Sequence, residues 1–132
     1  MQEPPLQFNQ TTGAVISAAL EVHRLLGPGF LETVYEEAMA IEMKLRNIPF
    51  ERQKAISVSY KGCRVGDGKL DFLIGGSLIV ELKAAERLLP IHQAQLMSYL
   101  KATRCQLGLL INFHERLLRD GVRRVIYTQA VE

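Results

Sequence analysis

The chain has 132 residues, of which 48% are hydrophobic, and a formal net charge of +2 at pH 7. This length suits one domain with one core, and the composition is that of an ordinary globular protein. The small positive charge permits a polyanionic partner without demanding one. Two cysteines are too few for a zinc motif or a disulfide framework, and no apolar run is long enough to span a membrane. We therefore expect a cytoplasmic protein with no membrane contact.

Apolar spacing divides the chain into helices and strands. We expect residues 1–9 to form a flexible leader and residues 10–132 to form a single domain. The spacing predicts helices over residues 10–26 and 30–46, and Pro90 begins a third that runs to about residue 102. The predicted apolar stripe of the second helix consists of Leu31, Val34, Tyr35, Ala38, Ile41 and Leu45.

Short apolar runs predict the strands. They cover residues 55–60, 70–74, 78–83, 106–113 and 122–127. Residues 61–68 contain glycine and are predicted to be a loop, and Asp120-Gly121 a turn. Helices flank these strands in sequence, and the central hairpin has apolar residues on both faces. The predicted fold class is therefore α/β, as a three-layer α/β/α sandwich with a mixed β-sheet.

Charged residues interrupt the two apolar runs of this hairpin. Asp71 lies in the first run and Glu81 in the second, with Gly75-Gly76-Ser77 between the runs. A two-residue turn would place the two carboxylates on opposite faces, whereas a three-residue turn places Asp71 directly across from Glu81. Lys83 would then share their face. The opposite face is wholly apolar and should lie on a core; it consists of Phe72, Ile74, Leu78, Val80 and Leu82.

Two facing carboxylates need a compensating charge. Their Cβ atoms would be roughly 5 Å apart, where like charges repel, and burying them unpaired is costly. A divalent cation with oxygen ligands would convert this repulsion into binding. The alternative is a cross-strand salt bridge from Lys83 to Asp71 or Glu81, which would leave the other carboxylate without a partner. We favour the metal.

Several motifs in order resemble a known family. Asp71, Glu81 and Lys83 on adjacent strands resemble the active-site signature of the PD-(D/E)XK nuclease superfamily. The segment Gly29-Phe30-Leu31-Glu32-Thr33-Val34-Tyr35 is similar to the motif that names its GxxExxY branch. The resemblance runs from about residue 10 to about residue 127. It implies the restriction-endonuclease-like form of the predicted sandwich.

The resemblance also implies a metal site. Asp71 and Glu81 would be ligands of Mg²⁺ or Mn²⁺, with the carbonyl of Leu82 as a third oxygen. Such a metal polarises the scissile phosphate and activates a water molecule. Lys83 would then orient that water or neutralise the transition state.

Further residues are candidates for this site through the same resemblance. Glu32 would point toward the site as a catalytic residue, although an acid in the first turn of a helix also meets the helix dipole favourably. Gln95 would line the site from the third helix, where Tyr99 shares its face. Tyr35, Tyr99 and Lys69 are candidates for contact with nucleic acid, although for Tyr35 we favour a core position on the apolar stripe.

The predicted function is a metal-dependent nuclease that hydrolyses phosphodiester bonds of nucleic acid, with DNA as the expected substrate. The alternative is a non-catalytic nucleic-acid-binding or assembly module with a nuclease fold. A hydrolase of small phosphodiesters also stays open, because the net charge is modest. A homodimer is a possible assembly, since the chain carries no apparent targeting domain.

Overall fold

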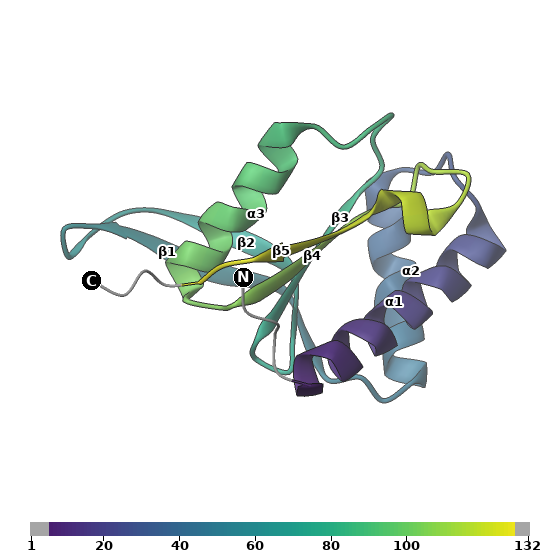
Figure 1. Ribbon diagram of the computed structural model, residues 1–132, viewed down its shortest axis with the longest axis horizontal. Helices are drawn as coiled ribbons and strands as arrows, with labels where there is room; N and C mark the ends of the chain where they lie inside the picture. The colour runs from purple at the N-terminus through teal and green to yellow at the C-terminus, as the bar shows by residue number, and fades with distance from the viewer. Residues whose placement is uncertain (1–5, 129–132) are drawn as a thin grey trace.

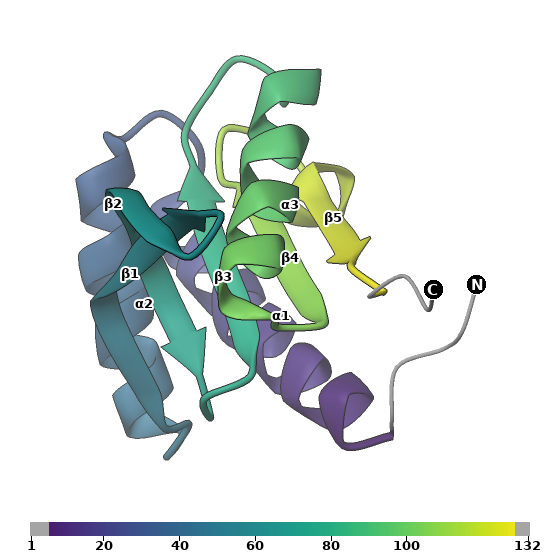
Figure 2. The ribbon, with the colours of Figure 1, turned by 90° about the vertical axis from the view of Figure 1, so that its left-hand side faces the viewer.

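The computed structural model describes the backbone of residues 6–128 and the side chains of residues 9–128. It contains a mixed five-stranded sheet in the order β1-β2-β3-β4-β5, in which β3 and β4 are parallel and the other neighbours antiparallel. The elements are α1 (Leu6–Leu26), α2 (Glu32–Leu45), β1 (Phe50–Tyr60), β2 (Cys63–Ile74), β3 (Leu78–Lys83), α3 (Pro90–Thr103), β4 (Leu107–Asn112), a 3-10 helix (Leu118–Gly121) and β5 (Val122–Ile126). Helices α1 and α2 cover one face of the sheet and α3 the other (Figures 1 and 2). The predicted three-layer sandwich is confirmed.

The turn between β2 and β3 has the predicted length. Ile74 pairs with Leu78, so Gly75-Gly76-Ser77 form the turn, which is closed by the amide of Ser77 donating to the carbonyl of Ile74 at 3.1 Å. Both glycines have positive φ, of 58° and 76°, which a residue without Cβ adopts at little cost. The face of Phe72 and Val80 is buried in the larger core, under α1 and α2, as predicted.

Strands β1 and β2 form a longer ribbon than predicted. The predicted loop over residues 61–68 is wrong, because β2 begins at Cys63 and a two-residue turn joins it to β1. Lys61 and Gly62 make this turn with φ of 51° and 81°, the conformation of a tight hairpin. Strand β3 pairs with β2 only over Phe72 to Ile74. The first half of β2 therefore pairs with β1 alone, and the two strands project beyond the rest of the sheet (Figure 1). The residues in this first half of β2 are mostly polar, so the sequence pattern did not indicate a buried strand there.

The buried face of α2 differs from the predicted stripe. Tyr35, Met39 and Met43 are fully buried against the sheet, whereas Ile41 and Leu45 are exposed. The helix carries two apolar stripes with helical spacing, and spacing alone does not say which one meets the sheet. The prediction therefore placed Tyr35 and Ala38 correctly against the core, but it placed Leu31, Ile41 and Leu45 on the wrong side.

The three helices begin and end close to the predicted residues. Helix α1 begins at Leu6, so residues 6–9 of the predicted leader are helical, while residues 1–5 lie outside the described part. The predicted turn at Asp120-Gly121 is the end of the short 3-10 helix. No helix among the described residues is both long and apolar enough to cross a membrane.

Gly121 allows the 3-10 helix to pack against the end of β4. A Cβ added there would collide with the backbone carbonyl of Asn112, a group that cannot swing aside. We expect Gly121→Ala to lower the free energy of unfolding by about 1–3 kcal/mol, as overpacking does in a filled core. Gly66→Ala is the control, because nothing lies within 4 Å of its added Cβ. Equal unfolding free energies for the two variants in urea titrations would contradict this packing.

Candidate active site

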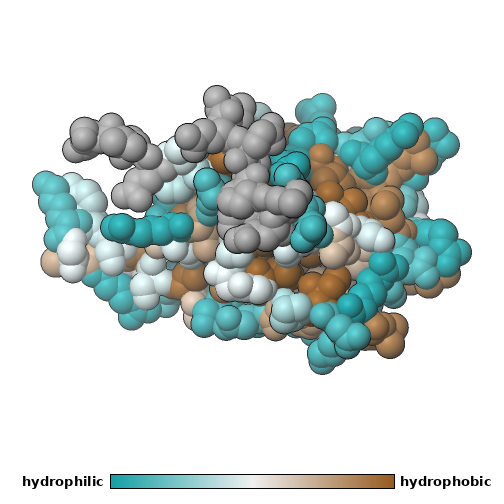
Figure 3. Space-filling view, turned by 60° about the horizontal axis from the view of Figure 1, so that its bottom comes forward, coloured by the Kyte–Doolittle hydropathy of each residue, from teal (hydrophilic) through white to brown (hydrophobic). Residues whose placement is uncertain are grey.

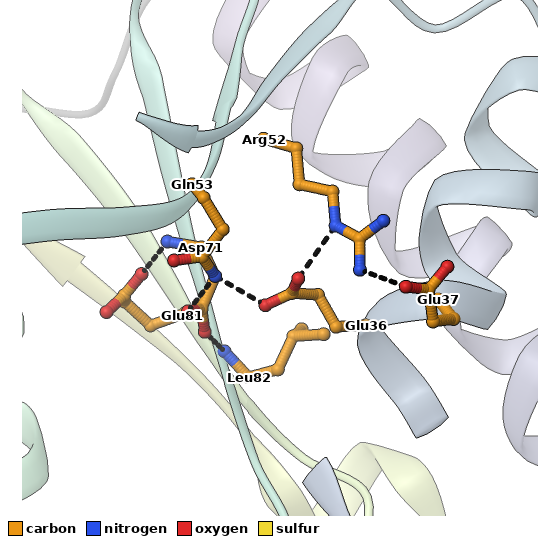
Figure 4. Close-up of polar contacts among 7 residues, drawn as sticks. All are labelled: Glu36, Glu37, Arg52, Gln53, Asp71, Glu81 and Leu82. Carbon is orange, nitrogen blue, oxygen red and sulfur yellow. Dashed lines mark hydrogen bonds and ion pairs between the residues drawn. The ribbon is translucent and has the colours of Figure 1, made fainter. Parts of the chain in front are cut away.

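Asp71 and Glu81 face each other where β2 and β3 separate. Backbone pairing between these strands reaches Phe72 and Val80. Beyond this pair, the amide of Asp71 donates to Oε2 of Glu81 at 2.7 Å, and the amide of Leu82 donates to Oδ2 of Asp71 at 2.8 Å (Figure 4). Each carboxylate thus binds the backbone of the opposite strand. The structure brings Asp71, Glu81 and the amide of Leu82 together, and their role as metal ligands stays a prediction.

The two carboxylates lie in a poorly hydrated position. Glu81 is only 4% exposed, and burial, with repulsion from Asp71 as the second cause, raises its pKa to about 8. Burial also raises the pKa of Asp71, against the lowering effect of its bond from Leu82. Hydrogen bonds to the main chain therefore do not compensate for lost hydration. The pair is short of positive charge.

Lys83 follows Glu81 by two residues and interacts electrostatically with both carboxylates. Its charge lowers the pKa of Asp71 and of Glu81, although in each case burial outweighs it. Among the residues that the structure describes, Lys83 forms no ion pair with either one, so the alternative of a cross-strand salt bridge is wrong. The carbonyl of Lys83 accepts the amide of Phe113 at 2.9 Å, which ties the end of β3 to β4.

Glu32 approaches the site from the first turn of α2. Its side chain is exposed, yet partial loss of hydration raises its pKa, Asp71 and Glu36 raise it further, and Lys83 lowers it. Glu32 in turn contributes to the raised pKa of Glu81. The structure thus brings Glu32 into the electrostatic field of the carboxylate pair.

Tyr35 has a structural position, so the favoured core interpretation is confirmed and the candidate contact with nucleic acid is wrong. It is fully buried, and its ring stacks on Phe113 with 4.6 Å between ring centroids. Its hydroxyl donates to the carbonyl of Gly27 at 2.6 Å and accepts the amide of Phe30 at 3.2 Å. Tyr35 therefore fixes the loop before α2, and with it the position of Glu32.

A polar network that the sequence did not reveal connects α2 to Asp71. Nε2 of Gln53 donates to Oε1 of Glu36 at 2.6 Å and makes a long contact of 3.4 Å with Oδ1 of Asp71. Arg52 donates to Glu36 at 2.7 Å and to Glu37 at 2.8 Å (Figure 4). Gln53 has a φ of 51° and interrupts the pairing of β1 with β2. The available signal was the spacing of Glu36, one helical turn after the predicted Glu32.

Asn112 is a second residue near the site that the sequence did not reveal. It is fully buried and lies beside Lys83 in the parallel pair of β3 and β4. Its Nδ2 donates to the carbonyl of Ala85 at 2.9 Å, and its Oδ1 accepts the amide of Ala85 at 3.0 Å and that of His114 at 3.3 Å. Asn112 therefore clamps the chain just after Lys83. The only hint in the sequence was that the side-chain amide of Asn112 stands at the end of an apolar run.

The remaining predicted site residues lie at the edge of this arrangement. Tyr99 is partly buried beside Gly68, where an added Cβ would lie 3.2 Å from its ring. Burial raises the pKa of Tyr99, and the charges of Glu81 and Asp71 raise it further. Gln95 and Lys69 are exposed, and the described structure shows no hydrogen bond from them to the carboxylates. Tyr99 is thus close to the pair, whereas Gln95 and Lys69 stay predictions.

The donor set fits a divalent cation held by few protein ligands. Among the described residues no three His, Cys, Asp or Glu side chains group as a metal site. The predicted set needs only Asp71, Glu81 and the carbonyl of Leu82. Each carboxylate has one oxygen bonded to a backbone amide and a second that no backbone amide contacts. Oxygen donors and uncompensated negative charge suit Mg²⁺ or Mn²⁺, which retain several water ligands.

Comparisons with known proteins agree with this class of fold. No curated protein matches the chain. Two solved structures share the fold. One is the crystal structure of SSO0001, with a TM-score of 0.50 and 18% identity over 76% of this chain and 50% of that one, so the chain spans half of its length. The other is an alkaline exonuclease (LHK-Exo) from Laribacter hongkongensis, with a TM-score of 0.51 and 14% identity over 97% of this chain and 73% of that one.

Mixed sheet, flanking helices and paired carboxylates define a nuclease-like α/β protein. The family model of the PD-(D/E)XK nuclease superfamily matches residues 9–125. The chain belongs to this superfamily. Its members generally use divalent metal ions and act on nucleic acid.

The raised pKa of Glu81 makes stability depend on pH. Between its ordinary value of 4.5 and its folded value of about 8, the folded protein holds a proton that the unfolded chain releases. The stabilisation that the proton on Glu81 provides is complete below pH 4.5 and is lost as the pH rises through about 8. We expect the metal-free protein to lose a few kcal/mol of unfolding free energy between pH 5 and 8.

Glu81→Gln should remove most of this loss, because glutamine still accepts the Asp71 amide but carries no charge. Thermal melts in EDTA at pH 5, 6, 7 and 8 measure the effect. Glu51→Gln is the control, since Glu51 is exposed and pairs only with Lys54 among the described residues. The same pH slope in wild type and Glu81→Gln would contradict the assignment.

Proposed function

We propose that the protein is a metal-dependent nuclease that hydrolyses phosphodiester bonds of nucleic acid, with DNA as the expected substrate. One observation carries this proposal. Asp71 and Glu81 are held face to face at the separation of β2 and β3, with Lys83 beside them and no ion pair among the three. Such an arrangement destabilises the free protein, so it is better explained by a ligand than by packing.

Asp71, Glu81 and the carbonyl of Leu82 would hold Mg²⁺ or Mn²⁺. When bound, the metal supplies Lewis-acid polarisation of the phosphate and an acidified water ligand. The protein holds the two carboxylates in place through the amides of Asp71 and Leu82, at 2.7 and 2.8 Å. Because these bonds come from backbone atoms, they survive the loss of either carboxylate's negative charge.

Lys83 and Glu32 would act on the reacting groups. The ammonium of Lys83 is a compact charge that offsets the negative charge developing on the phosphate oxygens. Glu32 has a raised pKa, so its carboxylate is a better proton acceptor than an ordinary glutamate and would orient the attacking water. Gln95 would contact the substrate from the exposed surface of α3, and Tyr99 from beside Gly68.

Unpaired cations supply a surface for the phosphate backbone. Lys69, Lys101 and Arg104 are exposed and, within the described structure, have no acidic partner at ion-pair distance. A groove of about 380 Å³ between β1 and α3 is lined by Lys101, Arg104 and three serines, with no carboxylate. These are phosphate-binding groups, on the side of the sheet that α3 covers.

Three finer statements are part of the proposal. The Gly29-to-Tyr35 motif supports membership of the GxxExxY branch. The free cysteines Cys63 and Cys105 suit a cytoplasmic location. A homodimer is the proposed assembly. None of them is needed for the proposed chemistry.

Substitutions in the site should separate binding from chemistry. We expect Glu81→Ala to abolish cleavage by removing a metal ligand. Lys83→Ala should slow cleavage by roughly 10² while leaving nucleic-acid affinity near wild type, because a group acting on the transition state affects turnover. Single-turnover cleavage of single-stranded, duplex and branched DNA and of RNA, with Mg²⁺, Mn²⁺ or EDTA, measures these effects.

Arg119→Ala removes an equal charge from an exposed position on the 3-10 helix and serves as the control for Lys83→Ala.

Glu32→Ala separates two roles. If Glu32 only interacts with the helix dipole, Glu32→Ala should lower stability by about 0.3–1 kcal/mol and leave activity intact. If Glu32 has the proposed role, the substitution should lower activity with little change in stability. If wild type and Glu81→Ala bind nucleic acid equally and neither cleaves any substrate with either metal, the protein is a binding or assembly module.

A further inference from the structure

Residues 54–69 of β1 and β2 form a two-stranded ribbon that projects from the sheet, and we call them the ribbon. Its strands pair only with each other, because β3 meets β2 no earlier than Phe72. Every ribbon residue is exposed except Ile56 and Gly68, which are half-buried. Helix α3 lies beside the ribbon in both views (Figures 1 and 2). Among the ribbon's hydrophobic residues, all of which the structure describes, only Ile56 packs against a core cluster. Packing of the core therefore does not account for the length of the ribbon.

Positive charge gathers on the ribbon and on the helix beside it. Residues 54–69 and 90–104 together contain six basic residues and one acidic residue, whereas the rest of the chain contains ten basic and thirteen acidic residues. These two segments thus carry a net charge of +5 and the remainder −3. Teal and white residues predominate at the ribbon end of the molecule, on the left of Figure 3. Charge of one sign gathered on one side is typical of a surface that binds a polyanion.

Four of these six cations have no acidic partner. Lys54 pairs with Glu51 at 2.9 Å, and Arg64 pairs with Asp67 at 2.8 Å. Within the described part of the chain, the other four form no ion pair: Lys61 and Lys69 of the ribbon, Lys101 of α3 and Arg104 just after it. All four are exposed. They are therefore available to the anionic groups of a ligand.

The groove of about 380 Å³ between β1 and α3 has the lining of a phosphate-binding surface. Three serines, Val58, Ala102, Lys101 and Arg104 line it, so it presents hydroxyl groups and two cations with no carboxylate and no aromatic ring. Serine, lysine and arginine side chains are the usual donors to phosphate oxygens. Proteins that bind single strands instead stack the bases on aromatic rings. The groove therefore suits the backbone of a strand and not its unstacked bases.

Tyr99 connects this groove to the carboxylate pair. It follows Ser98 of the groove lining, and a Cβ added to Gly68 of the ribbon would lie 3.2 Å from its ring. Burial raises the pKa of Tyr99, and the charges of Glu81 and Asp71 raise it further. Tyr99 thus lies between the groove and the field of the two carboxylates. A strand held in the groove would pass close to the proposed site.

We infer that the ribbon enters the major groove of duplex DNA, while Lys101 and Arg104 bind phosphates of a strand that borders that groove. This inference rests on the proposed function and narrows its substrate to the B-form duplex. The major groove of B-DNA is about 12 Å wide and admits a two-stranded ribbon. That of duplex RNA is deep and narrow, so it excludes the ribbon. Tyr60 and Val65, which are 62% and 63% exposed, give the ribbon apolar surface toward the base edges.

Fluorescence anisotropy in EDTA measures this binding without cleavage. The probes are a short labelled DNA duplex, one of its single strands, and an RNA duplex of the same sequence. Wild type should bind the DNA duplex more tightly than the other two. Lys101→Ala and Arg104→Ala should each weaken duplex binding severalfold and lower the slope of log affinity against log salt by about 1.

Lys44→Ala is the matched control for these two variants. Lys44 is an exposed lysine in the last turn of α2, as Lys101 is in the last turn of α3. Helix α2 covers the opposite face of the sheet, so this variant should bind the duplex as wild type does.

Lys61→Glu tests the ribbon itself. Lys61 lies in the turn at the end of the ribbon and is exposed, so a reversed charge there should weaken duplex binding about tenfold. Lys44→Glu is the control for this charge reversal. Urea titration should give the same free energy of unfolding for both variants as for wild type.

Four results would overturn the inference. They are equal affinity for the DNA duplex and the single strand, equal affinity for the DNA and RNA duplexes, Lys101→Ala and Arg104→Ala that bind like Lys44→Ala, and Lys61→Glu that binds like wild type. Binding in EDTA does not depend on cleavage. The expected binding by a protein that cleaves nothing would contradict the nuclease proposal alone, whereas cleavage with wild-type affinity in the groove variants would contradict this inference alone.

Discussion

Two hydrogen bonds determine the geometry of the site: the amide of Asp71 donates to Glu81, and the amide of Leu82 donates to Asp71. Each carboxylate accepts a backbone amide of the opposite strand, at 2.7 and 2.8 Å, just beyond the point where the strands stop pairing. The bonds hold two negative charges face to face in a position where burial raises both pKa values. Burial and repulsion together create a site that favours the arrival of positive charge.

Elements around the pair maintain this arrangement from three sides. Tyr35 fixes the loop that leads into α2 and so positions Glu32. Gln53 connects Glu36 of the same helix to Asp71, and Asn112 clamps the chain that follows Lys83. Of the residues around the carboxylate pair, only Glu32 and Lys83 have a proposed role in the chemistry. The others are positioning residues, whose substitution should disturb the site through its geometry.

The hairpin and its carboxylates could be predicted because strand alternation and turn length are local. The alternation of side chains along the two strands placed Asp71 opposite Glu81, and it placed Phe72 on the apolar face. Non-local features could not be predicted in the same way. The parallel register that places Asn112 beside Lys83 depends on α3 and its loops, and Gln53, with its positive φ, contacts Glu36 of α2, which is distant in sequence. The exposed apolar row of α2, with Ile41 and Leu45, was mistaken for its core face because both faces have helical spacing.

Calorimetric titration of Mn²⁺ or Mg²⁺ tests the central claim most directly, namely that Asp71 and Glu81 together bind a divalent cation. Titrations at pH 7 in buffers of different ionisation enthalpy also measure how many protons are released when the metal binds. Since the raised pKa of Glu81, about 8, keeps most of this group protonated, binding should release about one proton per ion. Glu81→Gln and Asp71→Asn should each abolish saturable binding. Absence of binding to the wild type, or binding that both variants retain, would contradict the account.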